Sequence, residues 1–372
     1  MTEPEPLQQI DRTWVRFRGR RLSYFSGCDY FRLASHPQVL AALVAGAKQF
    51  SLSVAASRLT TGNHILYQRL EKVLAKFFRS EDAVLVSTGY LSDVIAAQAL
   101  VRNFSHALID ERAHPALVDA SRFLDCPVLQ FRHRNPASLA QVVARCGPGS
   151  RVFLLTDGMF AHDGSVAPLK DYLKALPKDA RILVDDAHGA GVLGANGRGS
   201  LEHSEVSRRR VIQTITLTKA FGTYGGAILG PASLRRSIVE RSKAFVGSTP
   251  VPLPLAAATL ESMKLLRTNP QWRRELRKNS DHVKTALRAA GYHLPETPGP
   301  IIPLPPLSKT ATGLLRQRLL DTGIYPPFVQ YPGGPQSGFF RFVISNQHTR
   351  EQLDQLVEVL VYGLASKPHC AG

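Results

Sequence analysis

A lysine and an aspartate–histidine motif follow two successive apolar runs of this chain. Asp185 and His188 come directly after Ile182-Leu183-Val184, and Lys219 follows the next run, at 214–217. Lysine is the side chain that binds pyridoxal phosphate as a Schiff base, and the ring nitrogen of that cofactor requires a carboxylate. The order and spacing of these residues therefore favour pyridoxal phosphate chemistry.

The same chemistry needs further groups around the ring, and the sequence can supply them. Asp185 ends an apolar strand, which predicts a position at the carboxyl edge of a sheet, where open α/β folds bind ligands. His188 would then reach the ring oxygen, and His114, shortly after another predicted strand, would stack on the ring. Taken singly, each histidine is typical of a structural residue and Lys219 of a surface lysine. The ordered set indicates catalysis.

The turn Thr88-Gly89-Tyr90 separates a predicted buried strand, 83–87, from a predicted helix that ends near Val101. Backbone N–H groups at such a strand-to-helix junction bind phosphate favourably. The sequence therefore predicts a phosphate site at Gly89 and Tyr90.

The elements that must position these residues alternate between strands and helices, which is typical of an α/β protein with a largely parallel sheet. Further strands are predicted at 107–110, 152–155, 182–185, 214–217 and 227–229, and helices at 37–50 and 67–78. After residue 254 we expect a long helical stretch to 290 interrupted near Pro270, a proline-rich segment at 295–306, a helix at 310–321, a strand at 340–344 and a helix from 349.

This change of pattern predicts two domains of unequal size. We expect an N-terminal segment at 1–40, a large cofactor-binding domain with a mostly parallel sheet at 41–262, and a smaller C-terminal α/β domain at 263–372.

The composition limits the class of protein. Of the 372 residues, 44% are hydrophobic and 20% charged, as in a globular enzyme. Without a membrane-length apolar run or a secretory signal, we expect a cytoplasmic protein with no membrane partner. Cys28, Cys126, Cys146 and Cys370 lack the spacing of a metal site and indicate free thiols, so no metal is expected.

The net charge of +17 would attract nucleic acid, coenzyme A, a phosphorylated substrate or an acidic carrier protein. Because the sequence contains no recognisable nucleic-acid module, we do not expect nucleic acid as a partner. The basic residues are most simply a solvated surface, with an anionic substrate as the alternative.

The chain resembles the α-oxoamine synthases, fold-type I enzymes that use pyridoxal phosphate, over nearly its whole length. The motifs that carry the resemblance occur in the family's order: Asp29-Tyr30, His36-Pro37, Gly89-Tyr90, His114, Asp163-Gly164, Asp185-Asp186-Ala187-His188-Gly189, Gly194-x-x-Gly197-Arg198-Gly199, Thr216-x-x-Lys219 and Ser248-Thr249.

The resemblance implies a role for each matched residue. Lys219 would bind the cofactor and move the α-proton, Asp185 would pair with the ring nitrogen, His188 with the ring oxygen, and His114 would stack. Thr216, Gly89 and Tyr90 would hold the phosphate, together with Ser248 and Thr249 from a second subunit of a homodimer with shared active sites. Arg341 would bind the substrate carboxylate through its planar fork, and Cys28 and Ser57 would line the substrate pocket.

The reaction implied is a condensation of a small amino acid with an acyl-CoA or acyl-carrier thioester, with decarboxylation, to an α-amino ketone. Several positions depart from the family pattern: Cys28 replaces an asparagine, Asp93 another asparagine, and Ala116 and Ala161 replace serines, while Tyr67 replaces a histidine. These changes indicate intact cofactor chemistry with an altered substrate pocket.

Two alternatives stay open on the sequence alone. One is another pyridoxal phosphate reaction on the same scaffold, namely transamination, decarboxylation or aldol cleavage. The other is a non-enzymatic basic protein on an enzyme fold, against which the retained Lys219 argues.

Overall fold

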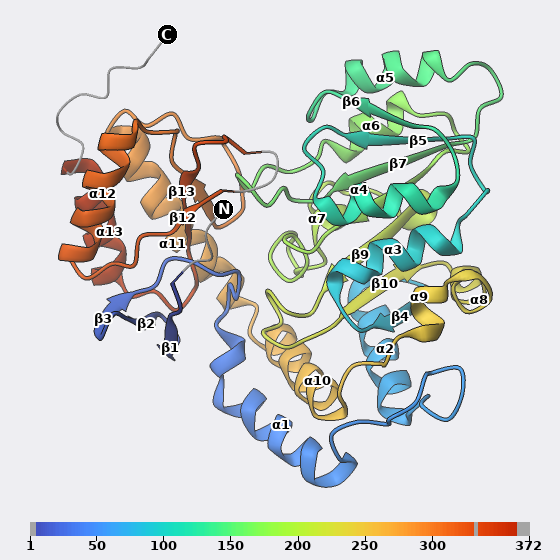
Figure 1. Cartoon of the computed structure of the whole chain (residues 1–372), viewed down its shortest axis with the longest axis horizontal. Coiled ribbons are helices and arrows are strands. Elements are labelled where there is room, and N and C mark those ends of the chain that lie inside the picture. The colour runs from blue at the N-terminus through green and yellow to red at the C-terminus, as the bar shows by residue number, and fades with distance from the viewer. Residues whose placement is uncertain (1–4, 331–333, 363–372) are drawn as a thin grey trace.

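A seven-stranded sheet forms the centre of the larger part of the molecule (Figure 1). The computed structural model describes residues 5–330 and 334–362. In sheet order, the strands are β4 (Asp82–Val86), β10 (Gly226–Gly230), β9 (Val211–Thr216), β8 (Arg181–Asp185), β7 (Val152–Asp157), β5 (His106–Asp110) and β6 (Val128–Phe131). Strands β9 to β6 run parallel, and β10 is antiparallel to both neighbours. The mostly parallel sheet is confirmed; the reversed strand and β6 were not predicted.

Helices cover both faces of this sheet, which explains why its strands read as continuous apolar runs. Phe153 and Leu183 pack toward α3 and α4, whereas their neighbours Leu154 and Val184 pack toward α5 and α6. The helices of this part are α2 (Ile65–Phe78), α3 (Gly89–Ala99), α4 (Pro115–Ser121), α5 (Pro136–Arg145), α6 (Leu169–Ala175), α7 (Ser200–His203), α8 (Ala232–Arg241) and α9 (Lys243–Gly247).

Polar residues end four adjacent strands at the same edge of the sheet. They are Asp110 of β5, Asp157 of β7, Asp185 of β8 and Thr216 of β9. In the strand register Asp157 lies directly opposite Asp185. Because parallel strands place their carboxyl ends together, this edge gathers groups that are far apart in the sequence.

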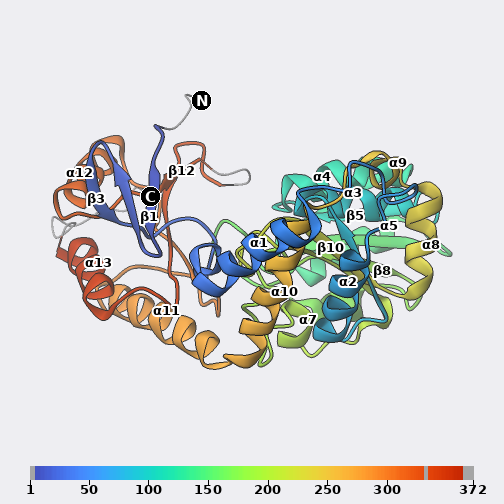
Figure 2. The same ribbon diagram turned by 90° about the horizontal axis from the view of Figure 1, so that it is seen from below.

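The second part of the molecule contains a smaller antiparallel sheet of order β11-β13-β12 (Figure 2). Its elements are α11 (Gln271–Ala289), β11 (Ile301–Pro303), α12 (Lys309–Asp321), β12 (Phe328–Val329), β13 (Phe339–Val343) and α13 (Arg350–Tyr362). The predicted interruption near Pro270 is present, because α10 (Leu253–Thr268) ends before it and α11 begins after it. Strand β11 arises inside the segment that was predicted only as proline-rich.

The N-terminal residues form a three-stranded meander that the sequence did not predict, made of β1 (Gln8–Asp11), β2 (Trp14–Phe17) and β3 (Arg20–Ser23). Ser23 exchanges backbone hydrogen bonds with Gly323 and Tyr325, and Phe25 belongs to the core of the second part. Helix α1 (Pro37–Phe50) then crosses to pack along α10 beside the large sheet (Figures 1 and 2).

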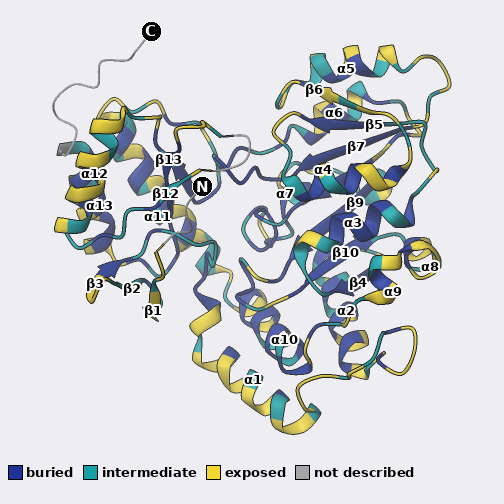
Figure 3. Ribbon diagram, viewed as in Figure 1, coloured by how far each residue is buried: buried dark blue, intermediate teal, exposed yellow. Residues whose placement is uncertain are grey.

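The burial of residues follows the arrangement of sheets and covering helices. Both sheets are largely buried, whereas the outer faces of α1, α5 and α12 are exposed (Figure 3). The predicted domain limits stay a prediction; the one between residues 262 and 263 falls within α10. Cys370 lies outside the described residues, within which Cys28, Cys126 and Cys146 are free thiols and no helix could span a membrane.

Candidate active site

Lys219, His188 and Tyr30 form a hydrogen-bonded chain at the carboxyl edge of the large sheet. The Lys219 Nζ atom lies 2.7 Å from His188 Nε2, and Tyr30 Oη lies 2.7 Å from His188 Nδ1. Tyr30 and His188 are buried, and Lys219 is partly exposed. When the lysine is an ammonium it can only donate, so Nε2 accepts and Nδ1 carries the proton donated to Tyr30.

Burial lowers the pKa of both basic groups in this hydrogen-bonded chain, Lys219 and His188. Burial lowers the pKa of Lys219, although Cys28 and Asp185 oppose that shift. Burial also lowers the pKa of His188 well below its usual value, and the positive charges of Lys219 and Arg341 add to the effect. His188 is therefore neutral at physiological pH, as its hydrogen-bonding pattern requires.

Two buried carboxyl groups, those of Asp157 and Asp185, lie at the same edge of the sheet. Asp185 accepts a hydrogen bond from the Ala187 amide at 3.0 Å, and Asp157 accepts one from the His114 amide at 2.9 Å. Burial raises the pKa of Asp157 well above its usual value, and the charge of Asp185 raises it further. Fully buried Asp93 receives the Thr214 hydroxyl at 2.5 Å, and its pKa is raised well above the usual value, first by burial and then by the charge of Asp185.

The adjacent Asp186 has a different role. Its Oδ2 atom accepts hydrogen bonds from the Ser200 amide at 2.8 Å and from Gln213 Nε2 at 2.6 Å. A Cβ atom on Gly199 would lie only 1.9 Å from that oxygen, so the glycine is required there. Asp186 therefore fixes the loop after β8, while Asp185 faces the lysine.

His114 lies on the same edge, as the N-cap of α4. Its Nδ1 atom accepts the Ala116 amide at 3.2 Å. Burial lowers the pKa of His114, and Asp185 and Lys219 are the charges that act on it next. These contacts orient its ring beside the lysine and aspartate, as a stacking group requires.

The predicted phosphate turn packs directly on β9. Thr88 caps α3 by accepting the Leu91 amide at 3.2 Å. A Cβ atom on Gly89 would lie 2.6 Å from Thr216 Cβ, so only glycine brings the helix N-terminus this close to the Thr216 hydroxyl. The Tyr90 ring meets His114 edge to face at 6.3 Å, and its hydroxyl donates to Asp119. Because the Tyr90 side chain is engaged by Asp119 and His114, the phosphate contact predicted for this residue would come from its backbone.

Arg341 reaches the site from β13 of the small sheet. Its Nε atom donates to the Ala161 carbonyl at 2.6 Å, and its Nη1 and Nη2 atoms lie 3.9 and 3.8 Å from Cys28 Sγ. Burial raises the pKa of Cys28, but the charges of Arg341 and Lys219 outweigh it and the net shift is downward. The thiol therefore lies between the two cations.

Three predicted site residues lie apart from this group in the single chain. Ser57 donates its hydroxyl to the Val246 carbonyl at 2.6 Å. Ser248 donates to Ala244 within the last turn of α9, and Thr249 is exposed. Their expected contribution to the cofactor or substrate, for Ser248 and Thr249 across a subunit interface, stays a prediction.

The residues present fit pyridoxal phosphate. The N-terminus of α3, where Gly89 packs without a Cβ against Thr216, suits the phosphate, Asp185 suits the ring nitrogen, and Lys219 suits the aldehyde. A separate cavity of about 810 Å³, between α1, α2 and α10, contains none of these residues.

Sequence reasoning assigned no role to Tyr30, Asp157 or Thr214. Asp157 could have been found, because it ends an apolar run just as Asp185 does. Tyr30 gave no such signal, since only the folded chain brings it to His188.

Three comparisons with known proteins describe what the chain is similar to. Residues 27–360 match the family model described as aminotransferase class I and II. The 8-amino-7-oxononanoate synthase of Thioalkalivibrio sulfidiphilus is 35% identical over 92% of this chain and 88% of its own length. That of Stutzerimonas stutzeri is 36% identical over 97% and 93%.

Solved structures share the fold. A Sphingomonas wittichii serine palmitoyltransferase superposes with a TM-score of 0.92 at 25% identity, covering 98% of this chain and 93% of its own. An 8-amino-7-oxononanoate synthase from Francisella tularensis superposes with a TM-score of 0.79 at 22% identity, covering 92% and 97%.

Proposed function

Because the chain belongs to the class I and II aminotransferase family, and within it to the α-oxoamine synthases, we propose that it joins a small amino acid to an acyl thioester. The products are an α-amino ketone, carbon dioxide and the free thiol. It is thus a pyridoxal phosphate-dependent C-acyltransferase of fold type I. The observation that carries the proposal is that Lys219, Asp185 and Arg341 meet in one buried site although Arg341 comes from the other sheet.

The cofactor, when bound, supplies an electron-withdrawing ring that stabilises a carbanion at the α-carbon of the amino acid. Lys219 Nζ, with its lowered pKa, is the base that accepts the α-proton. His188 and Tyr30 hold that nitrogen in place through the two 2.7 Å contacts. The α-carbon then bonds to the thioester carbonyl carbon, the thiol leaves, and the α-carboxylate departs as carbon dioxide.

Arg341 binds the amino-acid carboxylate. Its Nε bond to Ala161 fixes the guanidinium plane and directs both Nη atoms toward Cys28, so a carboxylate beside the thiol would meet two donors. Because Cys28 replaces a family asparagine, the pocket offers a sulfur where an amide would stand.

We propose alanine and the thioester of a seven-carbon dicarboxylic acid as the substrates. The name 8-amino-7-oxononanoate synthase, borne by several relatives, describes a nine-carbon product with an amine at C8 and a ketone at C7. Alanine contributes two carbons after losing its carboxylate, and a seven-carbon acyl group supplies the rest. The net charge of +17 favours an anionic acyl chain and its carrier.

We also propose a cytoplasmic homodimer. In it, Ser248 and Thr249 of each subunit complete the phosphate site of the other, which fits the exposure of Thr249 in the single chain. Mixing inactive Lys219→Ala and Thr249→Ala subunits should restore part of the activity, because one hybrid site then keeps both residues. A mixture no more active than its components would contradict the shared site.

The test of the reaction is a thiol-release assay with single amino acids and acyl-CoA or acyl-carrier thioesters of different chain length. We expect thiol release and α-amino ketone with alanine and the seven-carbon thioester. Keto acid formed without thiol release would point to transamination on the same scaffold. Amine formed without thiol release would point to simple decarboxylation.

A further inference from the structure

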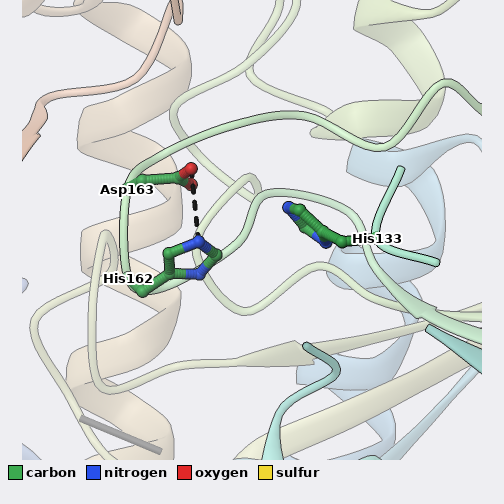
Figure 4. A group of neighbouring side chains, drawn as sticks. All are labelled: His133, His162 and Asp163. Atoms are coloured by element: carbon green, nitrogen blue, oxygen red, sulfur yellow. Dashed lines mark ion pairs between the residues drawn. The ribbon is translucent and has the colours of Figure 1, made fainter. Parts of the chain in front are cut away.

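The side chains of His133, His162 and Asp163 form a cluster (Figure 4), and none of the three belongs to the candidate active site described above. One ligand atom of each residue lies within 4.8 Å of the others, and His162 Nε2 lies 3.2 Å from Asp163 Oδ2. The two histidine rings come from different segments, one after β6 and one after β7. Their centroids are 5.5 Å apart.

His133 leaves one nitrogen available to the cluster. Its Nδ1 atom lies 2.8 Å from Asp110 Oδ1, and Asp110 already accepts backbone amides from Arg112 and Arg134, so it acts as an ionised acceptor. His133 Nδ1 therefore donates. Its Nε2 atom is buried and has no hydrogen-bond partner among the described residues. A buried polar atom of this kind requires an explanation.

The turn that carries the other two residues is tightly fixed. The Phe160 amide donates to Ser165 at 2.8 Å, and the Gly164 amide donates to Phe160 at 2.9 Å. Asp163 Oδ1 accepts the Ser165 amide at 2.8 Å, which leaves Oδ2 facing His162.

We propose that His133, His162 and Asp163 bind a divalent transition metal, with zinc as the best match. Two imidazoles and one carboxylate, with a fourth position for water, are a common zinc ligand set. A metal-bound histidine commonly donates its other ring nitrogen to a carboxylate, which orients the ring. Asp110 is that carboxylate for His133. A tetrahedral zinc site needs ligand atoms about 3.4 Å apart, which small side-chain rotations reach from the present separations.

This site goes beyond the proposed function, and it reverses the expectation of no metal, which rested on cysteine spacing. One neighbouring side chain, the cation Arg112, would repel a bound metal ion. Arg112 Nη1 lies 3.3 Å from His162 Nε2, but the residue is exposed and its guanidinium can turn to solvent.

The test is a zinc titration of the metal-stripped, tag-free holoenzyme, followed by calorimetry and by metal analysis after dialysis. Wild type should bind one zinc ion, and His162→Met should bind zinc with an affinity more than about a hundredfold weaker. Arg112→Gln should bind zinc more tightly than wild type, because a competing cation is gone. The control His293→Met removes an exposed histidine elsewhere and should bind as wild type does.

Asp163→Asn provides a second variant, and the absorbance of the lysine-bound cofactor shows whether each variant is folded. Cobalt(II) in place of zinc should give wild type, and not His162→Met or Asp163→Asn, the visible spectrum of a four-coordinate site. Equal zinc binding by wild type and both variants, with all proteins folded, would overturn the proposal. Loss of zinc in His293→Met would overturn it as well.

Discussion

Replacing Asp93 by asparagine should stabilise the protein at neutral and alkaline pH. Asp93 is fully buried, and its pKa is raised well above the usual value, first by burial and then by the charge of Asp185. The folded protein therefore holds a proton that the unfolded chain releases above about pH 4. Asparagine keeps the shape of the protonated acid without its ionisable proton, and its oxygen can accept from Thr214.

The magnitude follows from proton linkage. A group whose pKa is raised on folding stabilises the folded state less as the pH rises, at about 1.4 kcal/mol per pH unit for one proton. This slope holds from the unfolded pKa up to the raised folded pKa, above which the loss is complete. The difference in unfolding free energy between Asp93→Asn and wild type should therefore grow with that slope over this window.

The assay is denaturant unfolding of the apoproteins at a series of pH values and at equal protomer concentration. Asp179→Asn is the matched control, because it removes an exposed carboxylate and should give a difference that changes little with pH. Asp93→Ala should destabilise at every pH, since it leaves a cavity and removes the shorter of the two hydrogen bonds of the Thr214 hydroxyl, which keeps only the 3.3 Å bond to Val184. A stability difference between Asp93→Asn and wild type that does not change with pH would refute the raised pKa of Asp93.

Further predictions concern the candidate site. Lys219→Ala should be colourless with pyridoxal phosphate and show no cofactor fixed by borohydride; coloured, reducible protein would contradict its role. Arg341→Lys should raise the KM for the amino acid roughly tenfold to a hundredfold, as expected for a lost bidentate charged bond, and leave cofactor affinity unchanged; equal losses in both would argue against carboxylate binding. Tyr30→Phe should lower kcat about two- to tenfold and shift its pH profile, because His188 loses the partner of Nδ1. Gly89→Ala should weaken cofactor binding in equilibrium dialysis, since its Cβ would meet Thr216 at 2.6 Å, and unaltered affinity would remove the phosphate assignment.

Much of the large sheet was predictable because its strands are buried on both faces. Continuous apolar runs such as 152–155 and 182–184 signal such strands without help from the rest of the chain. Strand β6 was missed because it is mostly exposed at the sheet edge, and the N-terminal meander because its short strands pack only on the distant C-terminal part. Neither carries a strong local pattern.

Some residues of the candidate site could likewise be predicted from local sequence patterns, and others could not. Asp185, Thr216 and Lys219 follow successive strands of the sheet, and parallel strands necessarily bring their carboxyl ends together. The choice between Asp185 and Asp186 followed from which residue ends the strand, and the structure directs Asp186 to Ser200 and Gln213. The position of Arg341 in the pocket could not follow from any local pattern.

The sequence alone thus determined the fold class, the cofactor chemistry and the strand-end residues, because local apolar patterns fix strands and strands fix an edge. Only the tertiary structure decided which distant groups meet there. Cys28 and Arg341 are 313 residues apart and Tyr30 and His188 are 158 apart, yet each pair is in contact. Such contacts depend on how the small sheet packs against the large one, and so do the proton and charge states of the buried groups.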